Sequence, residues 1–513
     1  MKLSLYRRKN TSLVDLTMNR AMLLDLIGKG ALVGVIAGFF GATFRYFILT
    51  SEHWRWSLMA HTDALSVIGW LLLMVVMAFI IDKTLQWAPL SGGSGIPQIE
   101  GEMQGIFSMK PYRILVSKYI GGALTGLAGF SVGREGPSVQ LGGAVGKIVS
   151  YWMKSPLREQ RILTSAGAAA GLAAAFSAPV SGAIFVFEEV HKSFYPLLVI
   201  PTFVAALISN FITAQLFGLQ PSLGFTVLDG LPLMYFPYLI PMGIGMGLLG
   251  VLFCRAIFLC KGLFERMPLS RCMKLVITFI VVALIGYDSQ LLLGGGNDLV
   301  AELAEHSHGL ALLACIVVGK ILLTSFCYGS GAQGGIFLPM LVIGGAAGAF
   351  SESLLTSFGC IQGDWVPQLV VCAMGGMLAA AMRTPLLAIL LVLEMTNSFH
   401  NIYAIGIVTI IAYLVAELCK EPPIYDSLLQ AMTKQPSMES IQTVFQTKIS
   451  VVSEHIGTAL EELDLPVGMN VVSVYRNGQY LVPLGSLQLM SGDELQVSCK
   501  RGDLKVGKDY FSK

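Results

Sequence analysis

The sequence predicts an all-α polytopic membrane protein with a small soluble α/β domain at its C-terminus. Hydrophobic residues make up 54% of the 513 residues and charged residues only 13%, whereas soluble domains carry about 25% charged residues. Apolar stretches recur from about residue 22 to about residue 420, and a membrane span needs about 20 such residues. The 56 glycines and 21 prolines interrupt these stretches, which predicts tilted and broken helices.

An internal repeat divides the membrane part into two halves. Residues 167–188 and 373–394 align at an offset of 206 residues, so that an LAAA motif, a proline and a glutamate coincide. A second block aligns at an offset of 202 residues and places Gly133–Pro137 on Gly335–Pro339. Two colinear blocks with Pro and Glu in register argue against chance similarity between Ala/Gly-rich helices.

The composition changes after about residue 421, and this change predicts the domain boundaries. Basic residues precede the first apolar stretch, and the positive-inside rule places such a segment in the cytoplasm. We therefore expect a cytoplasmic segment at 1–21, a transmembrane domain at 22–429 with halves at about 22–220 and 235–425, a linker at 430–442, and a soluble domain at 443–513.

Local patterns predict the elements of the soluble domain. Residues 456–465 have helical spacing, while 471–475, 480–482 and 494–500 are strand-like. Asn477-Gly478 separates the first two of these strands, and Asn-Gly between β-rich runs is a strong hairpin signal. We expect one helix and a hairpin-containing sheet.

The first motif that carries chemistry is Gly92–Pro97, with the sequence GGSGIP. Glycines before a proline-marked helix start leave backbone N–H groups free, and such a helix N-terminus attracts anions. The Ser94 hydroxyl is able to donate one more hydrogen bond. An ordinary glycine-rich turn that caps a helix is an equally good interpretation of this motif alone.

The second motif, Gly133–Pro137, places Glu135 within an apolar region. A charged residue at a helix centre costs about 2.5–3.5 kcal/mol on insertion scales, so an intramembrane acid is a functional candidate. The flanking glycines leave room for the side chain to swing. A carboxylate that takes the place of an anion would be both gate and proton carrier. The alternative is a structural ion pair with Arg134.

The third motif, Gly334–Pro339, is the repeat partner of the second and has Phe337 where the first half has Glu135. One half thus supplies a titratable acid, and the other supplies apolar side chains with free backbone amides. Two facing helix N-termini would bind a monovalent anion without a fully charged Lys or Arg. This suits a transport site, because an ion that is held too tightly is not released.

In this order and spacing, the motifs GSGIP, GREGP and GGIFLP resemble the CLC chloride channels and transporters over most of residues 90–425. The resemblance implies two inverted repeats and a homodimer with one pore per subunit. It also implies a multi-pass protein of the cell membrane with both termini in the cytoplasm. Retention of Ser94 and Pro137 favours chloride over nitrate or fluoride. Gln98 departs from the Glu of many members.

Site residues follow from the resemblance position by position. Ser94 and Gly95 correspond to the chloride-binding loop, Ile336 and Phe337 to the residues whose backbone amides face the anion, and Tyr425 to the tyrosine whose hydroxyl completes the site. Without the other motifs, Tyr425 would be taken for an interfacial belt tyrosine.

Two acids decide between an exchanger and a channel. Glu135 resembles the external gating glutamate, and Glu189 resembles the internal proton-transfer glutamate of proton-coupled members. Glu188 has Glu394 as its repeat mate, whereas Glu189 has Met395, so Glu189 is the unduplicated acid. We therefore expect a chloride/proton antiporter. The alternatives are a passive voltage- or pH-gated chloride channel, in which Glu188 and Glu189 merely end a helix, and, remotely, a potassium-transport component.

The C-terminal part resembles the RCK-C, or TrkA-C, domain, which implies a small ligand or a role in dimerisation. This C-terminal resemblance is the one feature that suggests potassium transport, and the sequence has no TVGYG-like selectivity filter to support that function. The nine cysteines and seven histidines form no metal-binding or catalytic pattern, so we expect no enzyme activity, metal or cofactor. Chloride, protons and the lipid bilayer are the expected partners, and the net charge of +2 gives no reason to expect nucleic acid.

Overall fold

The computed structural model describes residues 20–433 and 442–511, except residues 62, 220–221, 228, 451–452, 467, 477 and 501–502. Most of the predicted N-terminal segment at 1–21 therefore lies outside the described residues. The chain divides into two compact units, Met1–Leu429 and Gln430–Lys513. Each unit is described by itself.

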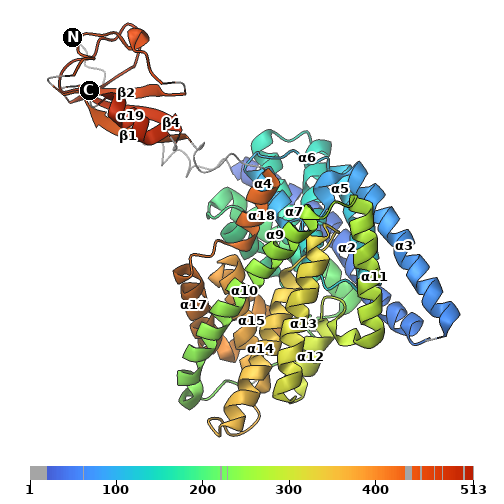
Figure 1. Ribbon diagram of the computed structural model, residues 1–513. Helices are drawn as coiled ribbons and strands as arrows, with labels where there is room; N and C mark the ends of the chain where they lie inside the picture. Colours follow the sequence, from blue (N-terminus) through green and yellow to red (C-terminus); the bar gives the residue numbers. More distant parts are fainter. Residues whose placement is uncertain are drawn as a thin grey trace. The chain divides into compact units, whose positions relative to one another are not determined.

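The first unit is helical, and its long helices lie side by side (Figure 1). Among the described residues, seven helical segments are long and apolar enough to cross a membrane. The elements of the first half are α2 (Arg20–Met59), α3 (Ala64–Trp87), η1 (Pro89–Ser91), α4 (Ile96–Met103), α5 (Pro111–Ala128), α6 (Glu135–Trp152), α7 (Leu157–Phe176), α8 (Pro179–Phe185), η2 (Val186–Val190) and α9 (Pro196–Phe217).

The second half repeats the order of the long helices, with η3 and α18 in addition. Its elements are η3 (Leu233–Tyr238), α10 (Leu239–Arg266), α11 (Arg271–Asp288), η4 (Gln290–Leu292), α12 (Asn297–Glu305), α13 (Leu310–Gly329), α14 (Phe337–Ser357), α15 (Val366–Met382), α16 (Pro385–Thr396), η5 (Phe399–Asn401), α17 (Ile402–Leu418) and α18 (Ile424–Thr433). The contacts repeat as well, because α6 packs on α7 as α14 packs on α15, and α7 packs on α9 as α15 packs on α17.

Proline and glycine break the chain where the repeat requires it. Proline occupies the first turn of α4, α8 and α16, where its missing N–H costs no helical hydrogen bond. In the first half, the glycines of residues 92–95 separate η1 from α4, and in the second half Gly294–Gly296 separate η4 from α12. The resulting short helices start inside the protein, which is how backbone amides come to face its interior.

The two halves meet along α8 and α16, which contact each other. The carboxylate at the end of each helix accepts hydrogen bonds from the first turn of the other, Glu394 from Val180 and Ser181, and Glu188 from Leu386 and Leu387. The two helices therefore run antiparallel and are related by a local two-fold axis. This is the arrangement expected of inverted repeats.

The second unit is a small α/β domain with one antiparallel sheet. Strand order is β1-β4-β2-β3, and the strands are β1 (Gln442–Lys448), β2 (Asn470–Arg476), β3 (Gln479–Leu481) and β4 (Glu494–Lys500). Helix α19 (Leu504–Phe511) contacts β1 and β4. The core includes Phe445, Val474, Leu495, Val497 and Phe511.

Three strands of this sheet confirm the strand-like patterns in the sequence. The hairpin is also present, because Arg476 pairs with Gln479 and Gly478 has a φ of 82°, although Asn477 lies outside the described residues. Of the predicted linker at 430–442, the first four residues continue α18 and Gln442 begins β1. Residues 434–441 lie outside the described part.

The helix predicted at 456–465 is wrong. This segment holds only the three-residue η7 (Leu460–Glu462). Its backbone amides bond across to another segment instead, since Leu460 donates to Leu487 and Glu461 to Gly485. Gly457, with a φ of 80°, also departs from helical geometry. The helix of the domain is α19, which the sequence interpretation did not identify.

Candidate functional site

Three glycine-rich loops meet at the centre of the first unit and are joined by backbone hydrogen bonds. Gly133 and Gly335 exchange two such bonds, of 2.7 and 2.8 Å between N and O. Gly93 donates to Ala332 and accepts from Gly334, both at 3.1 Å. The motifs that the sequence singled out, although up to 240 residues apart in the chain, thus form one structure.

Ser94 lies in the first loop and is buried, with 1% of its surface exposed. Gly95 follows it as the N-cap of α4 and has a φ of 104°, a conformation that glycine adopts without strain. The Ser94 hydroxyl has no hydrogen-bond partner among the described residues. A buried hydroxyl without a partner is costly, so this one is positioned for a group that the protein itself does not supply.

Glycine at position 136 allows the second loop to approach Ser94. A Cβ atom there would lie 2.4 Å from Ser94 Oγ and 2.7 Å from the Ser94 carbonyl oxygen, closer than any side chain tolerates. The start of α6 therefore packs directly against the serine, and the two motifs line the same small volume.

Glu135 is the first residue of α6 and is completely buried. Neither carboxylate oxygen has a hydrogen-bond partner in the part of the chain that the structure describes. Arg134 Nε is 3.9 Å from Oε1, and the backbone amide of Leu338, near the start of α14, also acts on the carboxylate. Glu135 therefore faces a helix N-terminus, which is the environment that attracts an anion. The ion pair with Arg134, which was the alternative interpretation of this motif, is present but long.

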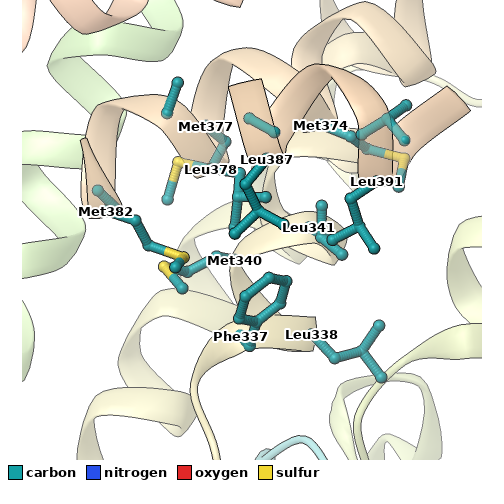
Figure 2. Close-up of a cluster of buried hydrophobic side chains, with 14 of the residues drawn as sticks. Phe337, Leu338, Met340, Leu341, Met374, Met377, Leu378, Met382, Leu387 and Leu391 are labelled. Atoms are coloured by element: carbon teal, nitrogen blue, oxygen red, sulfur yellow. The ribbon is translucent and has the colours of Figure 1, made fainter. Parts of the chain in front are cut away.

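Ile336 and Phe337 form the start of α14, with Ile336 as the N-cap, and both are fully buried. Figure 2 shows Phe337 in one hydrophobic cluster with Met340, Leu341 and Leu387. The ring also lies 5.4 Å from that of Phe176. This packing fixes the helix start, so that its free backbone amides have a defined direction.

Tyr425 lies in the first turn of α18 and is fully buried, unlike a belt tyrosine. Its hydroxyl approaches that of Ser94, although it has no hydrogen-bond partner by strict geometry among the described residues. The Tyr425 hydroxyl also interacts electrostatically with Glu135 and with Glu189. Tyr425 thus lies beside Ser94 and experiences the charge of both acids.

Glu189 and Glu188 lie in η2, a single π-helical turn, and have different surroundings. Glu188 is half-buried and both its oxygens accept hydrogen bonds from the first turn of α16. Glu189 has 2% of its surface exposed, and it caps no helix in the described part of the chain. A π-turn inside a helix often marks a functional position. The capping role of Glu188 is shared by its repeat mate Glu394, and Glu189 has no glutamate as its mate.

Three residues of the site were missed or set aside by sequence reasoning. Lys118, fully buried, donates to the carbonyls of Ser91 and Gly93. Gln98, which the sequence marked only as a departure from the Glu of many family members, donates to the Gly92 carbonyl at 2.6 Å and so supports the same loop. The Tyr328 hydroxyl lies against Gly93. The repeat match of Lys118 with Lys320 was the signal that would have identified the lysine.

The loop-supporting lysine has a counterpart in the second half. Lys320, also fully buried, donates to the carbonyls of Leu293 and Gly294. Those residues lie 202 positions after Ser91 and Gly92. At the same offset, however, Ser94 corresponds to Gly296. Only the loop of the first half therefore supplies a hydroxyl at this position, and the two loops are not equivalent.

Comparison with known proteins gives consistent matches for both units. A family model described as "Voltage gated chloride channel" matches residues 77–417, and one described as "TrkA-C domain" matches residues 448–512. The H(+)/Cl(-) exchange transporter ClcA of Vibrio cholerae is 34% identical over 434 residues, which cover 80% of this chain and 90% of the relative. That of Citrobacter koseri is 31% identical over 442 residues, with coverages of 82% and 91%.

Solved structures share the fold of the membrane unit. A slow cyanobacterial Cl-/H+ antiporter superposes with a TM-score of 0.75 at 31% identity, covering 80% of this chain and 98% of that structure. A CLC-type fluoride/proton antiporter gives a TM-score of 0.65 at 23% identity, with coverages of 79% and 97%. The second similarity concerns the fold alone.

Proposed function

Because this chain belongs to the voltage gated chloride channel family, we propose that it is an antiporter that moves chloride across the membrane in exchange for protons. Relatives at 31–34% identity are named H(+)/Cl(-) exchange transporters. The passive channel is less well supported, since those names describe exchange. Potassium transport is supported only by the TrkA-C match, which is confined to residues 448–512.

One observation carries the proposal: Glu135 is a completely buried carboxyl group without a hydrogen-bond partner among the described residues, and it faces the helix start at Leu338. Isolated buried charge is strongly unfavourable, so the site favours either a proton on Glu135 or the displacement of its side chain. Both events change what is able to occupy the space at the helix N-termini.

The exchange cycle follows from this competition. When Glu135 is ionised, its carboxylate takes the anion position at the start of α14. When it binds a proton, the neutral side chain is no longer attracted there, and chloride binds to the backbone amides near Ile336 and Phe337 and to the Ser94 and Tyr425 hydroxyls. Glu189 exchanges protons with the cytoplasmic side. Chloride and proton therefore share the end of the path at Glu135 and separate near Glu189.

The test is proton movement into proteoliposomes under a chloride gradient. The wild type should move protons against their own gradient. Glu135→Gln should abolish proton movement, because the amide no longer titrates. Glu189→Gln should also abolish it but should still conduct chloride, because Glu189 does not contact the anion path. Glu188→Gln is the matched control, one residue away, and should retain exchange.

Each alternative gives a distinct result. Chloride flux without proton movement in the wild type would make the protein a channel. Retained exchange in Glu189→Gln would overturn the role of that residue while leaving exchange itself intact. Flux of potassium without chloride would overturn the assignment altogether.

We also propose that the protein is a homodimer in the cell membrane, with one pore per subunit and with both termini in the cytoplasm. The exposed apolar helices of the membrane unit support a multi-pass protein, and the bacterial relatives support the plasma membrane. Cross-linking in liposomes tests the dimer, and protease accessibility of the C-terminal unit in oriented vesicles tests the orientation.

The C-terminal domain is proposed to bind a small ligand that regulates transport, as the TrkA-C match suggests. Deletion of residues 443–513 should change flux or dimer stability. Unchanged flux together with unchanged dimerisation would exclude both a regulatory and an assembly role for this domain.

A further inference from the structure

A lysine and an aspartate join the two segments that carry Glu189 and Tyr425. Lys192 follows Glu189 by three residues, and Asp426 directly follows Tyr425. The Lys192 ammonium contacts both oxygens of Asp426, at 2.5 and 2.6 Å. The Lys192 side chain is 47% exposed and that of Asp426 is 25% exposed, so solvent reaches this pair.

A third charged residue connects the pair with the protein interior. Glu100, in α4, is completely buried, and its Oε1 lies 3.7 Å from Lys192 Nζ and accepts a hydrogen bond from Gln104. Its Oε2 has no partner among the residues that the structure describes. Glu100 interacts electrostatically with Asp426 and is the leading charged neighbour of Glu189. An unpartnered oxygen of a buried acid is a place for a proton or a water molecule.

Glu188, the acid next to Glu189 in the chain, caps a helix. Both oxygens of Glu188 cap α16 through Leu386 and Leu387, so its hydrogen-bonding capacity toward a mobile proton is reduced. Glu100 has one oxygen free. Of Glu188 and Glu100, only Glu100 therefore combines complete burial, a free oxygen and a connection to solvent through Lys192 and Asp426.

We propose that Asp426, Lys192 and Glu100 form the proton portal that connects the cytoplasm with Glu189. This inference rests on the proposed exchange function. Asp426 takes a proton from water and releases it to Glu100, which passes it to Glu189 directly or through a bridging water. Each carboxylate that releases the proton becomes an anion again, and each that receives it becomes a neutral acid. Lys192 keeps its own protons throughout and holds the two carboxylates together.

The charged groups that face the portal come from four segments of the described chain. Lys192 and Asp426 face it from the segment after η2 and from α18, Glu100 from α4, and Glu188 and Glu189 from η2. Because Lys192 forms ion pairs with both Asp426 and Glu100, its removal leaves an excess of negative charge. This excess should disfavour ionisation of Asp426 and Glu100 and slow the release of protons.

The test measures chloride and proton fluxes separately in proteoliposomes of the full-length protein. A positioned acid accelerates proton transfer by about 10²–10⁴-fold, and water partly bypasses a portal near the surface. We therefore expect Asp426→Asn to lower proton flux by about tenfold or more, with chloride flux changed by less than about twofold. Asp426→Glu should restore the proton flux, and Lys192→Met should lower it as well.

Glu421→Gln is the matched control, since Glu421 has its own ion pair with Arg255 at 2.9 Å and lies five residues before Asp426. It should leave the ratio of proton to chloride flux unchanged. A purely structural role of Asp426 would lower both fluxes in proportion, and this outcome, or an unchanged ratio in Asp426→Asn, would overturn the portal. Absence of proton movement in the wild type would instead overturn the proposed function.

Discussion

Glu188 and Glu394, 206 residues apart in the chain, each cap a helix of the opposite half: Glu188 caps α16, which contains Glu394, and Glu394 caps α8, which ends shortly before Glu188. Glu188 accepts from Leu386 and Leu387 at 3.1 and 2.6 Å, and Glu394 accepts from Val180 and Ser181 at 3.1 and 2.7 Å. The relationship is reciprocal, which explains why this pair, and not the pair of Glu189 and Met395, is matched in the repeat.

Removal of either cap should destabilise the fold without uncoupling transport. Glu394→Ala leaves two backbone N–H groups at the start of α8 without their acceptor, and an unsatisfied buried donor costs about 1–3 kcal/mol. We expect a lower melting temperature in detergent. The ratio of proton to chloride flux should match that of the wild type.

Glu394→Gln retains one acceptor oxygen and should therefore lose less stability than Glu394→Ala. An altered flux ratio in either variant would contradict a purely structural role. A melting temperature equal to that of the wild type would show that water replaces the cap.

Gly136 should be required for chloride binding because it lies so close to Ser94 that no side chain fits between them. An alanine Cβ would lie 2.4 Å from Ser94 Oγ, so Gly136→Ala must displace the serine or the start of α6. Overpacking of this kind costs about 1–3 kcal/mol. We expect chloride and proton fluxes to fall together, by about tenfold, as measured in the same proteoliposomes.

The matched control is Gly69→Ala in α3, where no atom lies within 4 Å of the new Cβ. It should transport normally. Normal chloride flux in Gly136→Ala would show that Ser94 does not need its present position.

Much of this site was predictable from the sequence, since Ser94, Glu135, Ile336 and Tyr425 all lie around the meeting point of the loops. Motif chemistry and the repeat locate Ser94, Glu135 and Ile336, because each is fixed by a local backbone requirement such as a glycine turn before a helix, whereas Tyr425 follows only from the family resemblance.

What the sequence did not predict depends on contacts between distant segments. Lys118 supports the Ser94 loop from 25 residues away, and nothing in its own surroundings indicates which carbonyls it contacts. Residues 456–465 have helical spacing but bond to residues 485–489, so tertiary hydrogen bonds override the local pattern. Lys192 and Asp426 are 234 residues apart, and no sequence period links them.

Lys118 and Lys320 allow a controlled test of the loop that holds Ser94. Lys118→Met removes the donor to the carbonyls of Ser91 and Gly93, which hold the loop that carries Ser94. Each hydrogen bond contributes about 0.5–1.5 kcal/mol. Chloride affinity, measured by titration calorimetry in detergent, should therefore fall by about tenfold or more.

Lys320→Met removes an equally buried lysine from the corresponding loop, which carries Gly296 in place of Ser94. It should destabilise the protein to a similar extent but leave chloride affinity nearly unchanged. Equal effects of the two variants on affinity would show that the lysines act through stability alone.

The C-terminal domain should lose stability in acid through Asp493. Burial of this carboxyl group opposes ionisation, but two hydrogen bonds from Arg476, of 2.6 and 2.7 Å, and one from the Met490 amide outweigh it and lower the pKa of Asp493. An unfolded chain has a pKa of about 3.9 at Asp. The stabilisation is therefore complete above that pH and is lost as the pH falls through the lower pKa of the folded state.

Hydrogen exchange of β4 in the full-length protein, measured at decreasing pH and corrected for the intrinsic exchange rate, checks this prediction. Protection should decline in the acid range in the wild type. In Asp493→Asn, protection should be lower at neutral pH and should depend less on acid, because the titrating group is gone while Arg476 loses its charged partner. An Asp493→Asn domain as well protected as the wild type at neutral pH would show that the ion pair adds nothing to the stability of this domain.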